Sequence, residues 1–105
     1  MIVYGLRNCD TCRKAMKSLE KSTLHDVRGD GFPPGLLEHA LAAFGSDLVN
    51  TRSTTWRGLS ESERAQPPLD LLKAHPALMK RPLVESDGRL FLGWTPATRK
   101  ALGVA

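Results

Sequence analysis

The two cysteines of this 105-residue chain, Cys9 and Cys12, are three positions apart, where a short apolar segment gives way to a helical pattern. We therefore expect both thiols in the first turn of a helix, which Asn8 or Asp10 would cap. A thiol there meets unpaired backbone N–H groups and the positive end of the helix dipole, and both stabilise the thiolate. Because the thiolate is the nucleophile, Cys9 is predicted to be reactive at neutral pH; the alternative is a small, inert, buried side chain.

Cys12 has two interpretations. One turn from Cys9, its sulfur is within bridging range, which would make it a resolving thiol. It also shares an apolar helix stripe with Ala15, Met16 and Leu19, which predicts a packed side chain. No metal site is expected, because none of the three histidines has finger-like spacing from these cysteines.

The elements that position the thiols can be read from hydrophobic periodicity. Residues 1–5 are predicted to form a buried strand, residues 10–21 a helix and residues 23–27 a second strand. A strand, helix and strand joined this closely imply a right-handed βαβ unit with parallel strands.

The middle of the chain is predicted to be helical. Its elements are, in order, a turn at 28–31, a helix opened by Pro33 and Pro34 and ending before Gly45, an irregular polar segment at 48–57, a short helix with a capping box between Ser60 and Glu63, and a helix that begins after Pro67 and ends before Pro76.

The pattern changes to strands after Pro82. Residues 82–85 and 89–92 read as a hairpin around Asp87-Gly88, and Thr95 would cap a last helix. The order is therefore βαβ, a helical middle and ββα. We predict one α/β domain over residues 1–105, with a mixed four-stranded sheet and a helical insertion at about 33–80.

The composition is that of an ordinary globular domain, with 41% hydrophobic and 25% charged residues. The net charge of +4 is scattered, and the helical cluster of Arg13, Lys14, Lys17 and Lys21 is expected to be a solvated face, so we expect no nucleic-acid binding. No apolar run approaches the ~20 residues that span a bilayer, and the N-terminus lacks a signal-peptide pattern. We expect a cytoplasmic monomer without membrane contact.

Four motifs resemble the arsenate reductase (ArsC)-related family, which includes the Spx regulators and the YffB-type proteins. They are residues 4–11 (Tyr-Gly-Leu-Arg-Asn-Cys-Asp-Thr), residues 50–57 (Asn-Thr-Arg-Ser-Thr-Thr-Trp-Arg), the segment from His75-Pro76 to Lys80-Arg81-Pro82-Leu83-Val84, and Gly93-Trp94. The Asn-Cys-Asp-Thr and Thr-Thr-Trp-Arg versions are most similar to the YffB branch. The resemblance implies a thioredoxin/glutaredoxin-like fold of βαβ plus ββα with a helical insertion.

The resemblance also implies roles for individual residues. Cys9 would do the thiol chemistry, and Pro82 would be a cis proline facing it, with a backbone edge for a thiol peptide such as glutathione. Arg81 would present its guanidinium to an oxyanion or carboxylate; its alternative is a surface ion pair. The remaining candidate substrate-binding residues are Asn8 and Lys14 near Cys9, and Arg52 and Arg57 in the polar segment.

The function implied by the resemblance is a thiol-dependent oxidoreductase that uses glutathione or another small thiol as co-substrate, with no tightly bound cofactor and with scope for an anionic substrate. Arsenate reductases of the glutaredoxin-linked type resemble each other in three arginines around the oxyanion. This chain keeps Arg81, whereas Asn50, with Arg52 close by, and Leu92-Gly93 stand at the other two places. Because several fixed cations are needed to stabilise an oxyanion, arsenate reduction is not expected.

Two other functions remain open at this point. In a Spx-like regulator, oxidation of the Cys9–Cys12 pair would tune binding to the RNA polymerase α subunit. The Cys-x-x-Cys pattern supports that interpretation, whereas the Thr-Thr-Trp-Arg motif and the end of the chain at Ala105 argue against it. The third is a thiol-binding module with little turnover.

Overall fold

The structure is a computed structural model that describes residues 1–104. The chain divides into two compact units. The sheet unit comprises residues 1–26 together with the chain from Arg81 onward, and the helical unit comprises Val27–Lys80. The predicted insertion at about 33–80 lies inside the helical unit.

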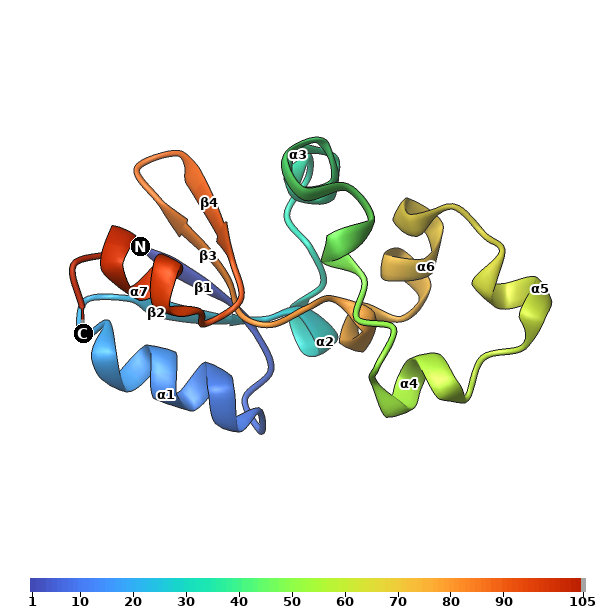
Figure 1. The fold of residues 1–105 in the computed structure, drawn as a ribbon, viewed down its shortest axis with the longest axis horizontal. Coiled ribbons are helices and arrows are strands. Elements are labelled where there is room, and N and C mark those ends of the chain that lie inside the picture. The colour runs from blue at the N-terminus through green and yellow to red at the C-terminus, as the bar shows by residue number, and fades with distance from the viewer. Residues whose placement is uncertain (105) are drawn as a thin grey trace. The chain divides into compact units, whose positions relative to one another are not determined.

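The sheet unit is built on four strands and two helices (Figure 1). Its elements are β1 (Ile2–Gly5), α1 (Asp10–Ser18), β2 (Thr23–Asp26), β3 (Leu83–Ser86), β4 (Arg89–Leu92) and α7 (Pro96–Ala101). The strand order is β2-β1-β3-β4; β1 pairs parallel with β2 and antiparallel with β3, and β3 pairs antiparallel with β4. The predicted mixed four-stranded sheet of βαβ plus ββα is confirmed.

One hydrophobic cluster of the sheet unit lies on one face of this sheet. Val3 on β1 pairs with Val84 on β3, and both side chains are fully buried. Leu19 joins them from the end of α1. The half-buried apolar residues around this cluster are Met16, Leu24, Phe91, Trp94, Leu102 and Val104. Because α1 and the segment around α7 both contribute, they cover the same face of the sheet.

Helix α1 carries the predicted apolar stripe, since Cys12, Ala15 and Leu19 are buried. The predicted cap is wrong: the N-cap residue is Cys9 itself, not Asn8 or Asp10. Cys9 has an extended backbone, with φ −94° and ψ 121°, and its carbonyl accepts the first helical hydrogen bond from the Arg13 N–H at 3.0 Å. The sequence therefore places a sulfur where a hydroxyl or carboxylate normally stands.

The hairpin and the last helix follow their sequence signals. Asp87 and Gly88 have φ values of 51° and 78°, as the tight turn between β3 and β4 requires. The Thr95 hydroxyl accepts the Thr98 N–H at 3.1 Å and so caps α7, which begins at Pro96. Both predictions are confirmed.

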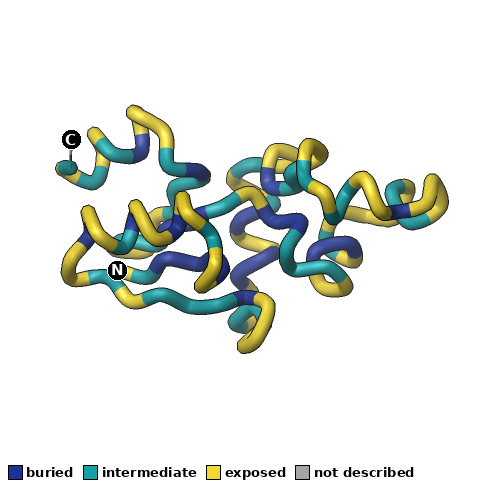
Figure 2. Tube along the Cα trace, turned by 90° about the horizontal axis from the view of Figure 1, so that it is seen from below, coloured by how far each residue is buried: buried dark blue, intermediate teal, exposed yellow. Residues whose placement is uncertain are grey.

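The helical unit consists of short helices. Figure 2 shows that buried and exposed stretches alternate along the chain. Its α-helices are α2 (Val27–Asp30), α3 (Leu36–Phe44), α4 (Thr54–Arg57), α5 (Glu61–Arg64) and α6 (Pro68–Ala74), with 3₁₀ turns η1 (Gly45–Leu48) and η2 (Pro76–Leu78). Helices α3 and α6 are in contact, and Leu48, Leu72, Leu78 and Met79 are fully buried.

Three details of this unit differ from prediction. Residues 27–30 form the short helix α2, where residue 27 was predicted to end the second strand and residues 28–31 to form a turn. Helix α4 interrupts the segment predicted to be irregular. Helix α3 begins at Leu36, not at Pro33, because Pro34 disfavours a helical conformation for the residue before it and Gly35 is left-handed with φ 82°. The capping box between Ser60 and Glu63 is confirmed.

Candidate active site

Cys9 is a half-buried free thiol at the N-terminus of α1. Its backbone N–H donates to the Leu6 carbonyl at 3.2 Å, which fixes the turn between β1 and the helix. The preceding loop is tied down by Arg7, whose carbonyl accepts the Arg13 Nε–H at 3.1 Å and whose guanidinium is 3.9 Å from the Asp26 carboxylate. The thiol therefore sits on a turn that is held from both sides.

The surroundings of Cys9 favour the thiolate. Partial burial opposes ionisation, but the backbone N–H of Cys12, the Cys12 thiol, the charge of Arg81 and the Thr11 N–H together outweigh it and lower the pKa of Cys9 below that of an ordinary thiol. These are the groups that a helix N-terminus and a nearby cation provide. Such an environment activates a cysteine as a nucleophile.

Cys12 has the opposite environment. Its side chain is only 1% exposed, and burial raises its pKa to about 12, to which its hydrogen bond with Cys9 and the negative charge there also contribute. The sulfur lies against the backbone of Gly5: a Cβ at that glycine would stand 2.3 Å from Cys12 Sγ. Cys12 is thus a packed thiol directly beside the reactive one.

Arg81 and Pro82 stand at the start of β3. The Arg81–Pro82 peptide bond is cis, which confirms the prediction for Pro82. Pro82 is buried, and its carbonyl accepts the Gly93 N–H at 2.8 Å. Arg81 is half-buried and takes part in none of the ion pairs within residues 1–104, while its charge lowers the pKa of Cys9. This placement favours a role beside the thiol over a surface ion pair.

The other residues predicted to bind substrate are exposed. Asn8 lies in the turn before Cys9, and Lys14 is on the solvent side of α1. Arg52 and Arg57 lie in the helical unit, Arg52 in the loop before α4 and Arg57 at the end of α4. The structure brings Cys9, Cys12 and Arg81 together, and the substrate roles of these exposed residues stay predictions.

The segment that carries Arg52 and Arg57 is ordered by its own side chains. The Asn50 amide oxygen accepts the Arg52 N–H at 3.0 Å, and the Ser53 hydroxyl caps α4 by accepting the Trp56 N–H at 3.1 Å. Arg64 closes the far end of the helix, a role that the sequence analysis missed. Its guanidinium stacks 5.4 Å from the Trp56 ring centroid and donates to the Trp56 carbonyl at 3.1 Å.

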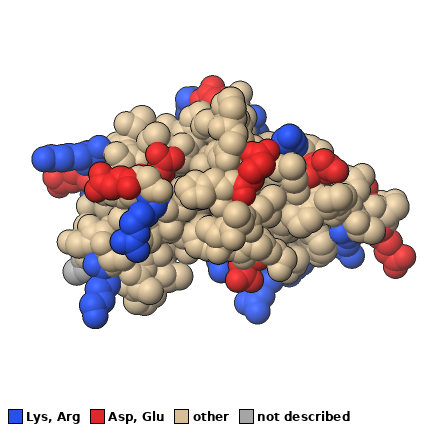
Figure 3. All heavy atoms as spheres, turned by 90° about the horizontal axis from the view of Figure 1, so that it is seen from above, with Lys and Arg blue, Asp and Glu red and all other residues tan. Residues whose placement is uncertain are grey.

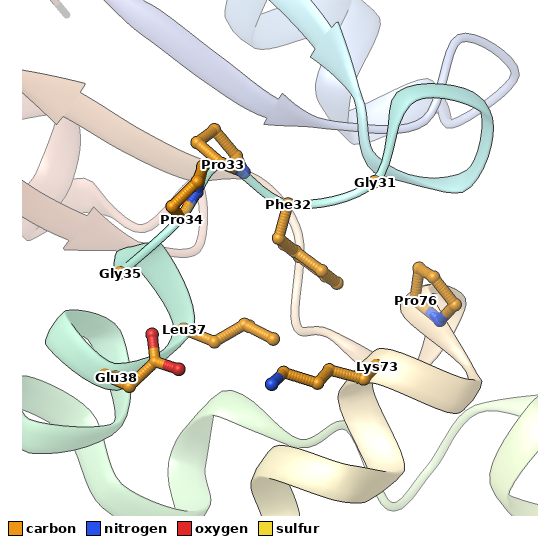
Figure 4. Close-up of a pocket in the computed structure, with 9 residues that line it drawn as sticks. All are labelled: Gly31, Phe32, Pro33, Pro34, Gly35, Leu37, Glu38, Lys73 and Pro76. Atoms are coloured by element: carbon orange, nitrogen blue, oxygen red, sulfur yellow. The ribbon is translucent and has the colours of Figure 1, made fainter.

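Two cavities lie in the helical unit. One, of about 530 Å³, is lined by Arg52 and Lys80 with Asn50 and Thr51, so it gathers two cations and polar groups. The other, of about 360 Å³, is lined mostly by apolar side chains and prolines, with Lys73 of α6 reaching toward Glu38 of α3 (Figure 4). None of the residues predicted to bind substrate lines this second cavity.

Surface charge, metal-ligand clusters and helix hydropathy were compared with the sequence-based expectations. Lys, Arg, Asp and Glu side chains are interspersed over the face shown in Figure 3, in agreement with the scattered charge of the sequence. Among the described residues no cluster of three or more His, Cys, Asp or Glu could hold a metal ion. None of the helices within residues 1–104 has the length and hydropathy to cross a membrane.

A thiol at the N-terminus of the helix after β1, on a sheet of order β2-β1-β3-β4, defines a thiol protein of the thioredoxin-like class. Residues 4–102 match the model of the ArsC family, and the chain belongs to that family. An uncharacterized protein of Haemophilus influenzae is 43% identical over 101 residues, which cover 88% of this chain and 89% of that protein. The global transcriptional regulator Spx of Bacillus subtilis is 28% identical over 102 residues, 88% of this chain and 78% of Spx.

Solved structures agree with the family. A YFFB protein superposes with a TM-score of 0.85 at 30% identity, covering 95% of this chain and 96% of that chain. An arsenate reductase (ArsC) related protein from Brucella melitensis gives a TM-score of 0.71 at 35% identity, covering 95% of this chain and 91% of that chain. The predicted family is confirmed, and the protein is a thiol-based, ArsC-like protein.

Proposed function

We propose that this protein is a thiol-dependent oxidoreductase that works with glutathione and uses Cys9 as its nucleophile. The observation that carries the proposal is the environment of Cys9, where the first-turn N–H groups, the Cys12 thiol and Arg81 lower the pKa of a half-buried thiol. Activation of this kind marks reactive cysteines and is absent from structural ones.

The reaction would be a pair of thiol–disulfide exchanges. The Cys9 thiolate attacks the glutathione sulfur of a mixed disulfide between glutathione and a substrate thiol. This step forms a Cys9–glutathione disulfide and releases the substrate as its thiolate. A second glutathione thiolate then attacks the glutathione sulfur on Cys9, which forms oxidised glutathione and returns the Cys9 thiolate. Over the two steps the sulfur of the second glutathione is oxidised as it enters the new disulfide, the substrate sulfur is reduced to a thiol, and Cys9 returns to its starting state.

Other residues of the sheet unit would hold the glutathione moiety. Arg81 offers a guanidinium fork to a carboxylate, and Pro82 presents the backbone at the start of β3. Asn8 and Lys14 would contribute a polar group and a charge near the thiol. Within the helical unit, Arg52 shares a polar cavity with Lys80, and Arg52 and Arg57 stay candidate residues for binding an anion.

A titration with reduced glutathione tests the proposal. Isotope-labelled protein should show NMR shift changes at Asn8, Cys9, Arg81 and Leu83, and Arg81→Gln should weaken them by about tenfold in apparent affinity. Lys17→Gln, on the exposed face of α1, is the matched charge control and should leave the affinity unchanged. If saturating glutathione leaves the residues around Cys9 unshifted, the glutathione-linked function is wrong.

A redox-dependent regulator is the second candidate. Two free cysteines one helical turn apart, in a chain 28% identical to the transcriptional regulator Spx, favour it. In that case an oxidant of the peroxide class would take two electrons from the Cys9 and Cys12 thiols and form a disulfide. Reduced and oxidised protein should then differ in their retention of the RNA polymerase α subunit in a pull-down. Equal retention at background level in both states would eliminate this candidate.

A further inference from the structure

The cavity of about 360 Å³ in the helical unit is separate from the thiol chemistry, because none of Cys9, Cys12 and Arg81 lines it (Figure 4). Its nine lining residues all lie between Gly31 and Pro76, within one compact unit. Ligand pockets in proteins have volumes of roughly 300–1,000 Å³, so this cavity has room for a small molecule and not for a long peptide.

One wall of the cavity is a loop with little conformational freedom. Residues 31–35, Gly-Phe-Pro-Pro-Gly, join α2 to α3. Gly31 and Gly35 have φ values of 70° and 82°, a conformation that favours glycine, and the two prolines between them hold φ at about −65°. Figure 4 shows the Phe32 ring extending from this loop toward α6. Because such a wall is already formed before binding, a ligand loses little free energy in ordering it.

The other walls are α3 and the end of α6 with the following η2. Helix α3 packs against α6, and α2 contacts η2, so the elements around the space are held together. Leu37 of α3 is buried, and Pro76 of η2 lies across from the Phe32 loop. The lining is therefore mostly apolar. A ligand side chain of the size of leucine or phenylalanine would gain about tenfold or more in affinity by leaving water here.

Two opposite charges interrupt this apolar lining. Glu38 of α3 and Lys73 of α6 both line the cavity, and their side chains point toward each other (Figure 4). Both residues are exposed, and the ion pairs within residues 1–104 include neither of them. A carboxylate and an ammonium group that face one cavity without pairing can each bind the opposite charge of a ligand.

We propose that this cavity binds a free α-amino acid with a large apolar side chain. The side chain of the ligand lies against Phe32, Leu37 and Pro76, its carboxylate pairs with Lys73, and its ammonium group pairs with Glu38. The apolar contact supplies most of the affinity, because ion pairs at exposed positions add little. The two charges fix the orientation of the ligand and select a zwitterion. This inference goes beyond the proposed thiol function and does not depend on it.

An NMR titration of the isotope-labelled full chain with L-phenylalanine tests the site. Amide shifts should change at Phe32, Gly35, Leu37 and Lys73. L-alanine, which lacks the ring, should bind at least about tenfold more weakly. The two probes 3-phenylpropionate, without the ammonium group, and 2-phenylethylamine, without the carboxylate, should each bind about threefold more weakly. Unshifted amides at the solubility limit of L-phenylalanine, or equal affinity for the three ring compounds, would overturn the proposal.

Two substitutions assign each charge to its partner on the ligand. Lys73→Gln should weaken binding of L-phenylalanine about threefold without weakening that of 2-phenylethylamine, which has no carboxylate. Glu38→Gln should have a similar effect on L-phenylalanine without weakening 3-phenylpropionate, which has no ammonium group. Lys17→Gln and Glu61→Gln, at exposed positions of α1 and α5, are the matched charge controls and should bind as the wild type does. Unchanged binding of L-phenylalanine in both cavity variants would refute the assigned charges.

Phe32→Ala tests the apolar wall. Loss of the ring should weaken binding of L-phenylalanine about tenfold. Phe44→Ala is the matched control, since it removes a half-buried ring at the end of α3 that does not line the cavity. Because loss of a packed ring lowers Tm in either case, affinities are compared at a temperature where circular dichroism shows both variants folded. Equal weakening by the two substitutions would exclude this cavity as the binding site.

Discussion

The sheet unit and the helical unit differ in how far apart in the sequence their interacting side chains lie. In the sheet unit the important groups come from ends of strands: Gly5 ends β1, Cys9 follows it, and Arg81 and Pro82 precede β3. In the helical unit the ordered groups are caps and clamps within 15 residues of one another, such as Ser53, Ser60 and Arg64.

This contrast shows where in the molecule a reactive thiol can form. A lowered thiol pKa needs several donors and a cation held around one sulfur, and the sheet supplies them by bringing together residues that are about 70 positions apart in sequence. Local helix caps order a loop but gather no such set. We therefore expect the sheet unit to control the activation of Cys9 and the helical unit to affect binding and stability.

The largest expected effect is that of Cys9→Ser. Because the serine hydroxyl is un-ionised at neutral pH, formation of the glutathione disulfide and turnover should fall by at least about a thousandfold. In the helical unit, the double change Arg52→Gln and Arg57→Gln should leave alkylation of Cys9 within about twofold of wild type, which mass spectrometry measures. Strong slowing by the arginine pair would break the division between the two units.

Truncation of a core side chain should lower the free energy of unfolding by a similar amount in either unit, but only truncation in the sheet unit should change the reactivity of Cys9. Val84→Ala on β3 and Leu72→Ala on α6 remove fully buried side chains, and each should lower the free energy of unfolding by about 3 kcal/mol in urea denaturation. Only Val84→Ala is expected to change the pH profile of Cys9 alkylation, because β3 carries Arg81 at its start. Equal profiles in both variants would contradict this expectation.

Much of the sheet unit could be predicted from the sequence, because its signals are local. Gly5 ends an apolar run, Asp87-Gly88 specifies a tight turn, and Thr95 before a proline specifies a helix start. The helical unit was predicted less accurately because its local signals are weak or misleading. The left-handed Gly35 delays α3 beyond its prolines, and no periodicity can show in a four-residue helix such as α4.

The site was predictable in its residue types but not in its contacts. Cys9 was predicted from its place at the start of the first helix. Arg81 and Pro82 were found only through motif positions, because residues this far from Cys9 in the sequence leave no periodic signal. The close approach of the Cys12 sulfur to Gly5 is a contact between β1 and α1, which no local sequence signal shows. The sequence places Arg64 at the end of the helix that the Ser60 capping box begins, but it does not show the contact of Arg64 with Trp56.

Alkaline pH should destabilise the sheet unit through Cys12. The pKa of Cys12 in the folded protein, about 12, lies above the ordinary value of 9.0. The contribution of the protonated Cys12 thiol to the free energy of unfolding is therefore complete below pH 9 and is lost as the pH rises toward 12. At pH 10.5 the loss should be about 2 kcal/mol in the free energy of unfolding, measured with urea under reducing conditions relative to pH 8. Cys12→Ala should lack this loss, while the raised pKa of Tyr4 affects both proteins alike. Equal losses of stability in the two proteins would show that Cys12 is not the cause of the alkaline destabilisation.

The smallest expected effect is in the helical unit, at the capping box. The Ser60 hydroxyl accepts the Glu63 N–H at 3.2 Å, and Glu63 Oε1 accepts the Ser60 N–H at 3.0 Å. Ser60→Ala should lower the free energy of unfolding by about 1 kcal/mol, whereas Ser18→Ala on the exposed end of α1 should change it little.

The same box gives the helical unit its own pH dependence, of opposite sign to that of Cys12. Hydrogen bonds from the Ser60 backbone and hydroxyl, with His75 Nε2 at 3.7 Å from Glu63 Oε2, lower the pKa of the Glu63 carboxyl. This stabilisation is present above the ordinary pKa of 4.5 and is lost as pH falls through the lowered one. Ser60→Ala should therefore lose less stability on acidification than the wild type, with Cys9 alkylation unchanged. A slower alkylation of Cys9 in this variant would show that the helical unit also controls the thiol.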